Sequence, residues 1–219
     1  MADFNPVEAE VALEQAGVRD VSRETLNKLN RFVATLNEWQ ASLNLMGPSA
    51  MSEVWIRHVA DSAQLVSVAP EARRWLDIGS GAGFPGIVVA VLLSRYPDSG
   101  VGLVESRARR CAFLREAARQ VGAPVTVHCD RAENVLENLP VPDAVSARAV
   151  APLTVILEWL EPLLRKGTTA YLHKGLDFEQ EWKSFRHQHR FDLLVHKSRI
   201  GPGVIAEVRA NSAKNHLET

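Results

Sequence analysis

A glycine-rich segment that follows a short apolar run is the part of this sequence best suited to bind a ligand. It reads Trp75-Leu76-Asp77-Ile78-Gly79-Ser80-Gly81-Ala82-Gly83-Phe84-Pro85-Gly86, with three glycines at alternate positions. Glycine has no Cβ, so the backbone turns sharply and a ligand can approach it closely. Pro85 is typical of a first helical turn, and an apolar run, residues 87–93, follows it. The pattern predicts a ligand-binding loop between a strand and a helix.

Two carboxylates beside this loop bear on which ligand it binds. The spacing Gly81-x-Gly83-x-x-Gly86 also matches the dinucleotide fingerprint, and Glu105 lies roughly 20 residues on, where a ribose-binding acid belongs. Asp77, however, would repel a pyrophosphate and attract the ammonium or sulfonium of S-adenosylmethionine, which carries no phosphate. Glu105 can accept hydrogen bonds from both ribose hydroxyls of either ligand. The residues favour S-adenosylmethionine and leave a nicotinamide dinucleotide as the alternative.

From residue 73 onward, short apolar strands alternate with helices. The predicted strands are residues 74–78, 101–105, 125–129, 144–147, 169–173, 193–200 and 204–210. The predicted helices are residues 85–95, 108–121, 134–139, 153–164 and 178–189. Such alternation is typical of right-handed βαβ units and a mainly parallel sheet covered on both faces. The last two strands are joined only by Gly201-Pro202-Gly203, so we expect them to pair antiparallel, because a parallel crossover needs more residues.

The expected fold is therefore α/β, a Rossmann-like, seven-stranded, mostly parallel sheet with its last strand antiparallel, as in many methyltransferases, plus an N-terminal helical extension. In that extension, an apolar stripe at helical spacing follows a capping Ser22 and comprises Leu26, Leu29, Phe32, Val33, Leu36 and Trp39. Residues 44–48 break this helix, and a second is predicted from residue 49 to about residue 68. The predicted units are the helical extension (1–72), an S-adenosylmethionine-binding core (73–210) and a polar tail (211–219).

Composition and charge exclude several other classes. The chain of 219 residues has a formal net charge of -1, so no overall basic field points to bare nucleic acid, although a local basic face would suffice. Its two cysteines, Cys111 and Cys129, lie in apolar stretches without metal-ligand spacing and are predicted to be buried free thiols. The acidic N-terminus does not resemble a signal peptide, and residues 87–93 are too few to span a bilayer. We expect a cytoplasmic monomer without a metal.

Other charged residues are candidates for ligand contacts. In a doubly wound sheet the ligand lies across the carboxyl edge of the strands, so Asp130 and Glu133, after the third strand, are placed to face an adenine. A surface carboxylate or helix cap is the other interpretation of each. Two basic groups are candidates for phosphate contacts, although a solvated helix face is the default. They are Arg107, Arg109, Arg110, Arg115 and Arg119, and Lys183, Arg186, Arg190, Lys197 and Arg199 with His187, His189 and His196.

Several short motifs, in order along the chain, together resemble one family. They are Leu43-Asn44-Leu45, Arg57-His58-Val59-Ala60-Asp61-Ser62, the loop from Asp77 to Gly86, Arg131-Ala132-Glu133, Ser146-Ala147-Arg148-Ala149-Val150-Ala151 and Lys174-Gly175. With them, nearly the whole chain resembles the RsmG (GidB) family of 16S ribosomal RNA guanine-N7 methyltransferases. The resemblance implies an S-adenosylmethionine-dependent enzyme whose partner is the small ribosomal subunit or its 16S RNA. The chain departs from the family's usual residues at Met46, Glu105 and His173.

The loop and the resemblance together assign residues to a site. They imply cofactor contacts at Asp77, Gly79, Ser80, Gly81, Gly83, Phe84, Glu105, Ala132, Glu133 and Arg148. The resemblance implies substrate contacts at Asn44, Arg57, His58, Asp61, Arg148 and Lys174. From the residues alone, Arg57 and Asp61 at positions i and i+4 would also suit a salt bridge within one helix. His58 would suit a packed histidine, and Arg148 an ion pair with Asp61 or Glu133.

The implied chemistry needs few protein groups. Guanine N7 carries a lone pair and no proton, so its methylation needs no general base, and no catalytic acid–base pair is predicted. The expected task is in-line placement of N7 behind the methyl group with water excluded. Three alternatives stay open: a methyltransferase for another substrate, a non-catalytic S-adenosylmethionine-binding RNA module, and a nicotinamide-dependent oxidoreductase. The low net charge favours a folded ribonucleoprotein over naked RNA as the substrate.

Overall fold

The computed structural model describes residues 5–211, and the predicted polar tail lies outside them except for Asn211. Its N-terminal part holds α1 (Pro6–Gln15), α2 (Arg23–Leu43), α3 (Pro48–Ser52), the π-helix η1 (Trp55–Ala60) and α4 (Asp61–Val68). The strands are β1 (Arg74–Ile78), β2 (Gly100–Val104), β3 (Val125–His128), β4 (Ala144–Arg148), β5 (Thr169–Lys174), β6 (Phe191–Lys197) and β7 (Val204–Ala210). Between them lie α5 (Gly86–Leu93), α6 (Ala108–Val121), α7 (Ala132–Val135), α8 (Leu153–Leu164), α9 (Phe178–Ser184) and the 3-10 helices η2 (Leu136–Asn138) and η3 (Gln188–Arg190).

The seven strands form one sheet in the order β3-β2-β1-β4-β5-β7-β6. The pairs among β1 to β5 are parallel, and β7 runs antiparallel to both β5 and β6. The predicted seven-stranded sheet with an antiparallel last strand is therefore confirmed. The order of strands reverses at β1, because β2 and β3 lie on one side of it and β4 and β5 on the other. Such a reversal leaves a crevice at the carboxyl edge of the sheet, and the glycine loop begins there.

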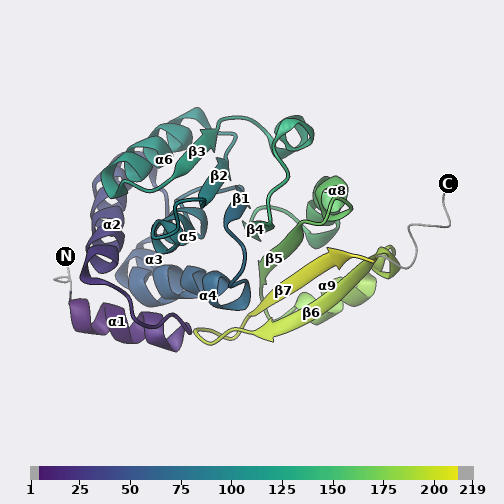
Figure 1. The fold of residues 1–219 in the computed structure, drawn as a ribbon, viewed down its shortest axis with the longest axis horizontal. Helices are drawn as coiled ribbons and strands as arrows, with labels where there is room; N and C mark the ends of the chain where they lie inside the picture. The colour runs from purple at the N-terminus through teal and green to yellow at the C-terminus, as the bar shows by residue number, and fades with distance from the viewer. Residues whose placement is uncertain (1–4, 212–219) are drawn as a thin grey trace.

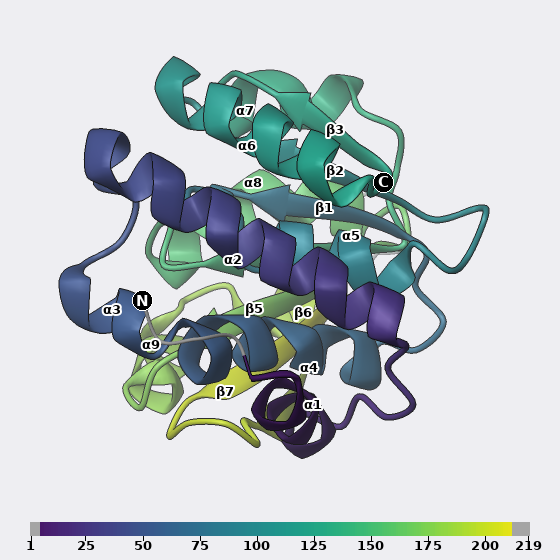
Figure 2. The same ribbon diagram turned by 90° about the vertical axis from the view of Figure 1, so that its left-hand side faces the viewer.

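Helices cover both faces of the sheet (Figure 1). On one face, α1, α2, α4, α5 and α6 share a buried apolar cluster with side chains of the sheet such as Trp75 and Leu103. On the other face, α7, α8 and α9 pack over Leu76, Val145 and Leu172. The N-terminal helices therefore belong to the same hydrophobic core as the sheet. Figure 2 views the molecule from the side of the N-terminal helices and shows α2 in front of α5.

Local sequence explains the long helix that lies over the glycine loop. The Ser22 hydroxyl accepts a hydrogen bond from the Thr25 amide at 3.1 Å and caps α2, as predicted. The apolar stripe of α2 faces the core, and Phe32 on it is fully buried. Asn44 ends the helix with φ 46°, in the left-handed region that asparagine adopts more readily than most residues.

Several predicted elements differ from those observed. The helix predicted over 134–139 is observed as α7 and the 3-10 helix η2. The single helix predicted over residues 49–68 is divided into α3, the π-helix η1 and α4. The helix predicted over 178–189 ends at Ser184, and the strand predicted over 193–200 is β6, which ends at Lys197. The Ser198 hydroxyl accepts hydrogen bonds from the amides of Ile200 and Gly201, which turns the chain out of the strand. Helical periodicity alone does not register such local turns.

The cysteine prediction was half wrong. Cys111 is a buried free thiol on α6, whereas Cys129 is a free thiol that is exposed. Cys129 follows the last residue of β3, so it lies past the covered part of the sheet. Within residues 5–211, no helix combines the length and the apolar character that a membrane span requires.

Replacing Phe32 with alanine should test the packing of α2 on the loop. The Phe32 ring lies 5.1 Å from the Phe84 ring, centroid to centroid, and is fully buried. We expect Phe32→Ala to lower the free energy of unfolding by about 3–5 kcal/mol, because it removes a large buried side chain. Urea denaturation measures the change. The exposed Leu194→Ala should alter it by about 0.5 kcal/mol or less; equal effects of the two variants would contradict this packing.

Candidate active site

The glycine loop folds back over the end of β2. The amides of Gly79 and Ser80 both donate to the Val104 carbonyl, at 2.8 and 3.1 Å. Gly79, Gly81 and Gly83 have φ values of 70°, 52° and 89°, in the left-handed region that favours glycine. The alternate glycines recognised in the sequence are therefore required by the backbone path.

Glu105 holds the loop from the neighbouring strand. Its carboxylate accepts a hydrogen bond from the Gly81 amide at 3.0 Å and another from the Arg107 amide at 2.8 Å. The Arg110 guanidinium lies 4.0 Å from it. The side chain is buried at the same carboxyl edge of the sheet as Asp77. The two predicted acids thus bind backbone amides at different points of the glycine loop, Glu105 at Gly81 and Asp77 at Gly86.

The Asp77 side chain is buried at the end of β1, with 1% of its surface exposed. It accepts a hydrogen bond from the Ser146 hydroxyl at 2.8 Å and one from the Gly86 amide at 3.3 Å. Burial outweighs these hydrogen bonds and raises the pKa of Asp77 to about 6. Both donors are neutral groups, and the positive charge of Arg148 offsets only part of the cost of burying the carboxylate.

A side chain that the sequence did not single out covers the loop. Val150 follows β4, and a Cβ placed on Gly79 would lie 2.3 Å from its Cγ2 atom. The preceding Ala149 has φ 52°, a conformation that L-residues rarely adopt. The motif Ser146-Ala147-Arg148-Ala149-Val150-Ala151 therefore reaches both the Asp77 carboxylate, through Ser146, and the glycine loop, through Val150.

The predicted residues after β3 lie at the outer end of this edge. Ala132 is buried at the start of α7. Glu133 is exposed and pairs with Arg131 at 2.7 Å. The Asp130 carboxylate accepts hydrogen bonds from the Arg131 amide and the Asn134 side chain, which matches its interpretation as a surface carboxylate. Glu133 was one of the two alternative partners considered for Arg148, and its partner is Arg131 instead.

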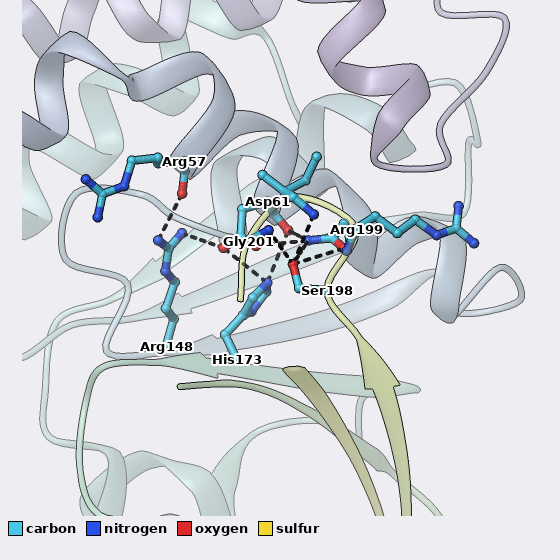
Figure 3. A network of polar contacts seen from close by, with 9 residues as sticks. Arg57, Asp61, Arg148, His173, Ser198, Arg199 and Gly201 are labelled. Carbon is cyan, nitrogen blue, oxygen red and sulfur yellow. Dashed lines mark hydrogen bonds and ion pairs between the residues drawn. The ribbon is translucent and has the colours of Figure 1, made fainter. Parts of the chain in front are cut away.

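Arg148 extends from the end of β4 to the N-terminal helices (Figure 3). Its Nη1 atom lies 3.3 Å from Asp61 Oδ2, so the predicted ion pair with Asp61 is confirmed. Its Nη2 atom donates to the Arg57 carbonyl at 3.0 Å. His173 on β5 contacts the Asp61 carbonyl through Nε2 at 3.1 Å, and burial lowers the pKa of this histidine. Since a carbonyl only accepts, Nε2 carries the proton.

The salt bridge considered between Arg57 and Asp61 does not form. Arg57 instead pairs with Glu53 at 3.0 Å, while Asp61 turns to Arg148. Residues 55–60 form a π-helix, in which the Asp61 amide donates to the Ile56 carbonyl five residues before it. This wider turn changes the angle between positions i and i+4 and leaves the Arg57 carbonyl for Arg148. The spacing argument assumed an α-helix.

His58 packs against the glycine loop as an uncharged ring. Its centroid lies 5.2 Å from that of Phe84. Burial, together with the positive charges of Arg148 and Arg57, lowers the pKa of His58 to about 4. Its Nε2 atom is buried and has no hydrogen-bond partner within residues 5–211. The predicted packed histidine is confirmed, and the packing is against a predicted cofactor residue.

A cavity of about 560 Å³ opens beside this network. Its charged lining residues are Arg57, Asp61, Arg148, Lys174, Asp177 and Glu181. Lys174 pairs with Glu181 at 2.7 Å. Four of the predicted substrate residues, Arg57, Asp61, Arg148 and Lys174, are thus brought together here. His58 lies against Phe84 instead, and Asn44 is an exposed helix end outside the described lining of this cavity.

Several arginines and lysines of the two basic groups are held by neighbouring residues. Arg119 pairs with Glu116 at 2.7 Å, and Lys183 pairs with Glu179 at 2.6 Å. Arg190 pairs with Glu161 at 3.2 Å. These contacts fit the default interpretation of solvated faces. Within the described residues, no group of three or more histidine, cysteine, aspartate or glutamate side chains is arranged to hold a metal ion.

Comparison with solved structures identifies the fold. The SAH-bound Podospora anserina methyltransferase PaMTH1 matches with a TM-score of 0.63 and 14% identity, over 97% of this chain and 99% of that one. Cofactor-bound Rv0187 from MTB matches with a TM-score of 0.61 and 20% identity, over 95% and 98% of the two chains. Together with the strand order, these likenesses establish a Rossmann-like methyltransferase fold.

Comparison of sequences identifies the family, which the fold alone does not. Residues 25–201 match the family described as rRNA small subunit methyltransferase G. A relative in Methylorubrum extorquens (strain PA1), named ribosomal RNA small subunit methyltransferase G, is 54% identical over 74% of this chain and 76% of its own. One of the same name in Chelativorans sp. is 43% identical over 89% and 93%. The chain belongs to the rRNA small subunit methyltransferase G family.

The contact between Gly79 and Val150 yields a test of the loop. We expect Gly79→Ala to weaken S-adenosylhomocysteine binding by about tenfold or more, because the added Cβ meets Val150 and the backbone is left-handed. Calorimetry measures the affinity. Gly79→Ala combined with Val150→Ala should recover part of the loss, since the clashing methyl groups are gone. Gly100→Ala, whose Cβ would meet nothing within 4 Å, is the control. Unchanged binding by Gly79→Ala would show that the loop is misassigned.

Proposed function

We propose that this protein transfers a methyl group from S-adenosylmethionine to N7 of a guanine in small-subunit (16S) ribosomal RNA. Membership of the rRNA small subunit methyltransferase G family supports the class of substrate. The observation that supports the identity of the cofactor is the buried Asp77 carboxylate, which accepts hydrogen bonds from neutral donors and lies at the end of β1, beside a loop of left-handed glycines. A cationic ligand without phosphate fits there, and a pyrophosphate does not.

The residues present would hold the cofactor across the carboxyl edge of β1, β2 and β3. Asp77 would balance its positive charge, Glu105 would accept hydrogen bonds from the ribose, and Ala132 with Glu133 would flank the adenine. Each carboxylate oxygen can accept more than one hydrogen bond, so Glu105 can serve the ribose while it holds the loop amides. Bound in this way, S-adenosylmethionine supplies a methyl group on a positively charged sulfur.

The cavity beside Arg148 is the proposed site of the target base. Asp61 and Glu181 offer carboxylate acceptors, while Arg148 and Lys174 offer donors, so both kinds of group on a guanine edge find partners. A base enters such a cavity only when it leaves the stack, which single-stranded segments of RNA allow. The cavity is lined by Ala147 and Arg148, and Val150, which lies over Gly79 of the glycine loop, is within three residues of them in the chain.

For this reaction the protein must position the guanine and exclude water, and it need not transfer a proton. N7 attacks with its own lone pair, and no proton leaves it, so no general base is required. Arg148 and Asp61 hold the wall of the cavity in a fixed position, which sets the direction of approach. Positive charge moves onto the guanine as the bond forms, and the Asp61 and Glu181 carboxylates stabilise it.

Methyl transfer to purified small ribosomal subunits tests the proposal. The subunits come from a strain that lacks this protein, and the donor carries a tritiated methyl group. We expect the label to co-migrate with 7-methylguanosine after digestion of the RNA, and Gly79→Ala to reduce its incorporation. Label in another nucleoside would reject N7. Label in transfer RNA or protein, with none in the subunit, would assign the enzyme to another substrate.

A further inference from the structure

A second cavity, of about 930 Å³, lies between α1, α2 and residues 51–56, outside the site described above. Its lining includes Val7 and Val11 of α1, Val33 of α2, and Ile56. Six large hydrophobic side chains are exposed within residues 5–211, and three of them lie here. They are Val7 (67% exposed), Val11 (46%) and Ile56 (54%). Clustered exposure of this kind marks an interaction surface, whereas single exposed apolar residues do not. We call it the α1–α2 groove.

The charges of the groove indicate what kind of partner fits. Its described lining has two charged residues, Glu8 and Glu53, and both are acidic. Because Glu53 is paired with Arg57 at 3.0 Å, the negative charge of the lining comes mainly from Glu8. Two more carboxylates on α1, Glu10 and Glu14, are exposed, and α1 has no basic residue. Such a surface repels the phosphates of RNA and attracts lysine and arginine. The occupant must therefore be both apolar and basic.

Polar groups in the groove suit a polypeptide backbone. Gln15, Asn30 and Asn37 line it together with the apolar side chains, and Asn5, whose side-chain oxygen caps α1, lies at its margin. A carboxamide both donates and accepts, so it can pair with the N–H and C=O groups of an extended or helical segment. Apolar anchors with amides around them are the usual composition of a protein-binding surface.

The groove is connected to the proposed target cavity through one short segment. Ile56 lines the groove, and the next residue, Arg57, lines the target cavity. Glu53 of the groove pairs with Arg57, whose carbonyl accepts the hydrogen bond from Arg148. A partner bound in the groove therefore lies on the other side of η1 from the base to be methylated.

We propose that the α1–α2 groove binds a basic, apolar protein segment of the ribonucleoprotein substrate and so selects the assembled particle over its free RNA. The proposal rests on the proposed function for the identity of the particle. Phosphate contacts would then be made elsewhere on the surface, and the groove would supply the affinity that distinguishes RNA with its proteins from RNA without them.

Binding of two matched probes tests this directly. The probes are purified small ribosomal subunits and the RNA extracted from the same subunits, each titrated with the fluorescently labelled full chain. Val11→Glu and Ile56→Glu put a charge in the apolar part of the groove. We expect each to raise the Kd for subunits about tenfold while the Kd for free RNA changes less than about twofold. Leu194→Glu, which makes the same kind of change at an exposed site on β6, should alter neither.

Reversal of a groove charge separates protein from RNA as the occupant. Glu8→Lys should weaken subunit binding if a basic segment binds there. Tighter binding of both probes would show that the groove meets phosphate and would overturn the proposal. So would equal losses on both probes, no loss on subunits, or a dimer of this chain, seen by sedimentation, that Val11→Glu dissociates. Urea unfolding of each variant reports whether it is folded.

The same titrations distinguish failure of this proposal from failure of the proposed function. Subunit binding that depends on the groove, without methyl transfer to subunit RNA, would leave the groove assigned and reject the guanine methylation. Methyl transfer to subunits and to free RNA with equal KM, unaltered by Val11→Glu, would keep the function and reject the groove.

Discussion

A carboxylate buried at the end of β1 is the constraint on which the site depends. Asp77 accepts hydrogen bonds from Ser146 of β4 and Gly86 of α5, so one group ties two strands and a helix together beneath the loop. Glycine is needed at position 86, because a Cβ there would lie 2.3 Å from a Leu103 methyl group and 2.8 Å from Asp77 Oδ2. Burial raises the pKa of Asp77 to about 6, so the ionised group is destabilised in the free protein. A bound cation would relieve this.

The N-terminal helices and the sheet act as one body because they share a core and a polar link. Phe32 of α2 and His58 of η1 both pack against the ring of Phe84 in the glycine loop. Arg148 binds both the carbonyl of Arg57 and the carboxylate of Asp61. Movement of η1 would therefore change the cavity beside Arg148 and the glycine loop together. The predicted division into an extension and a core remains a division of the sequence, with no gap between them in packing.

Features encoded by local pattern could be predicted from the sequence, and features set by contacts between distant segments could not. The glycine loop and the antiparallel hairpin follow from alternate glycines and from a connection too short for a crossover. The π-helix η1 was missed, because apolar spacing does not distinguish it from an α-helix, and the partner of Arg57 was missed with it. Val150 was recognised only as part of the motif of residues 146–151, and its position over Gly79 depends on a contact between distant segments. Cys129 was placed wrongly because strand ends are uncertain by a residue or two.

Proton release on cofactor binding tests the central claim, that the loop is built beside a carboxylate whose ionised form is destabilised by burial. Calorimetry of S-adenosylhomocysteine binding in buffers of different ionisation enthalpy counts the protons. The pKa of Asp77 is raised in the free protein, and a bound cation lowers it, so binding should release about half a proton near pH 6 and almost none at pH 8. Asp77→Asn should abolish this pH dependence. Binding that releases no proton at pH 6, or the same number at pH 6 and pH 8, would contradict the account.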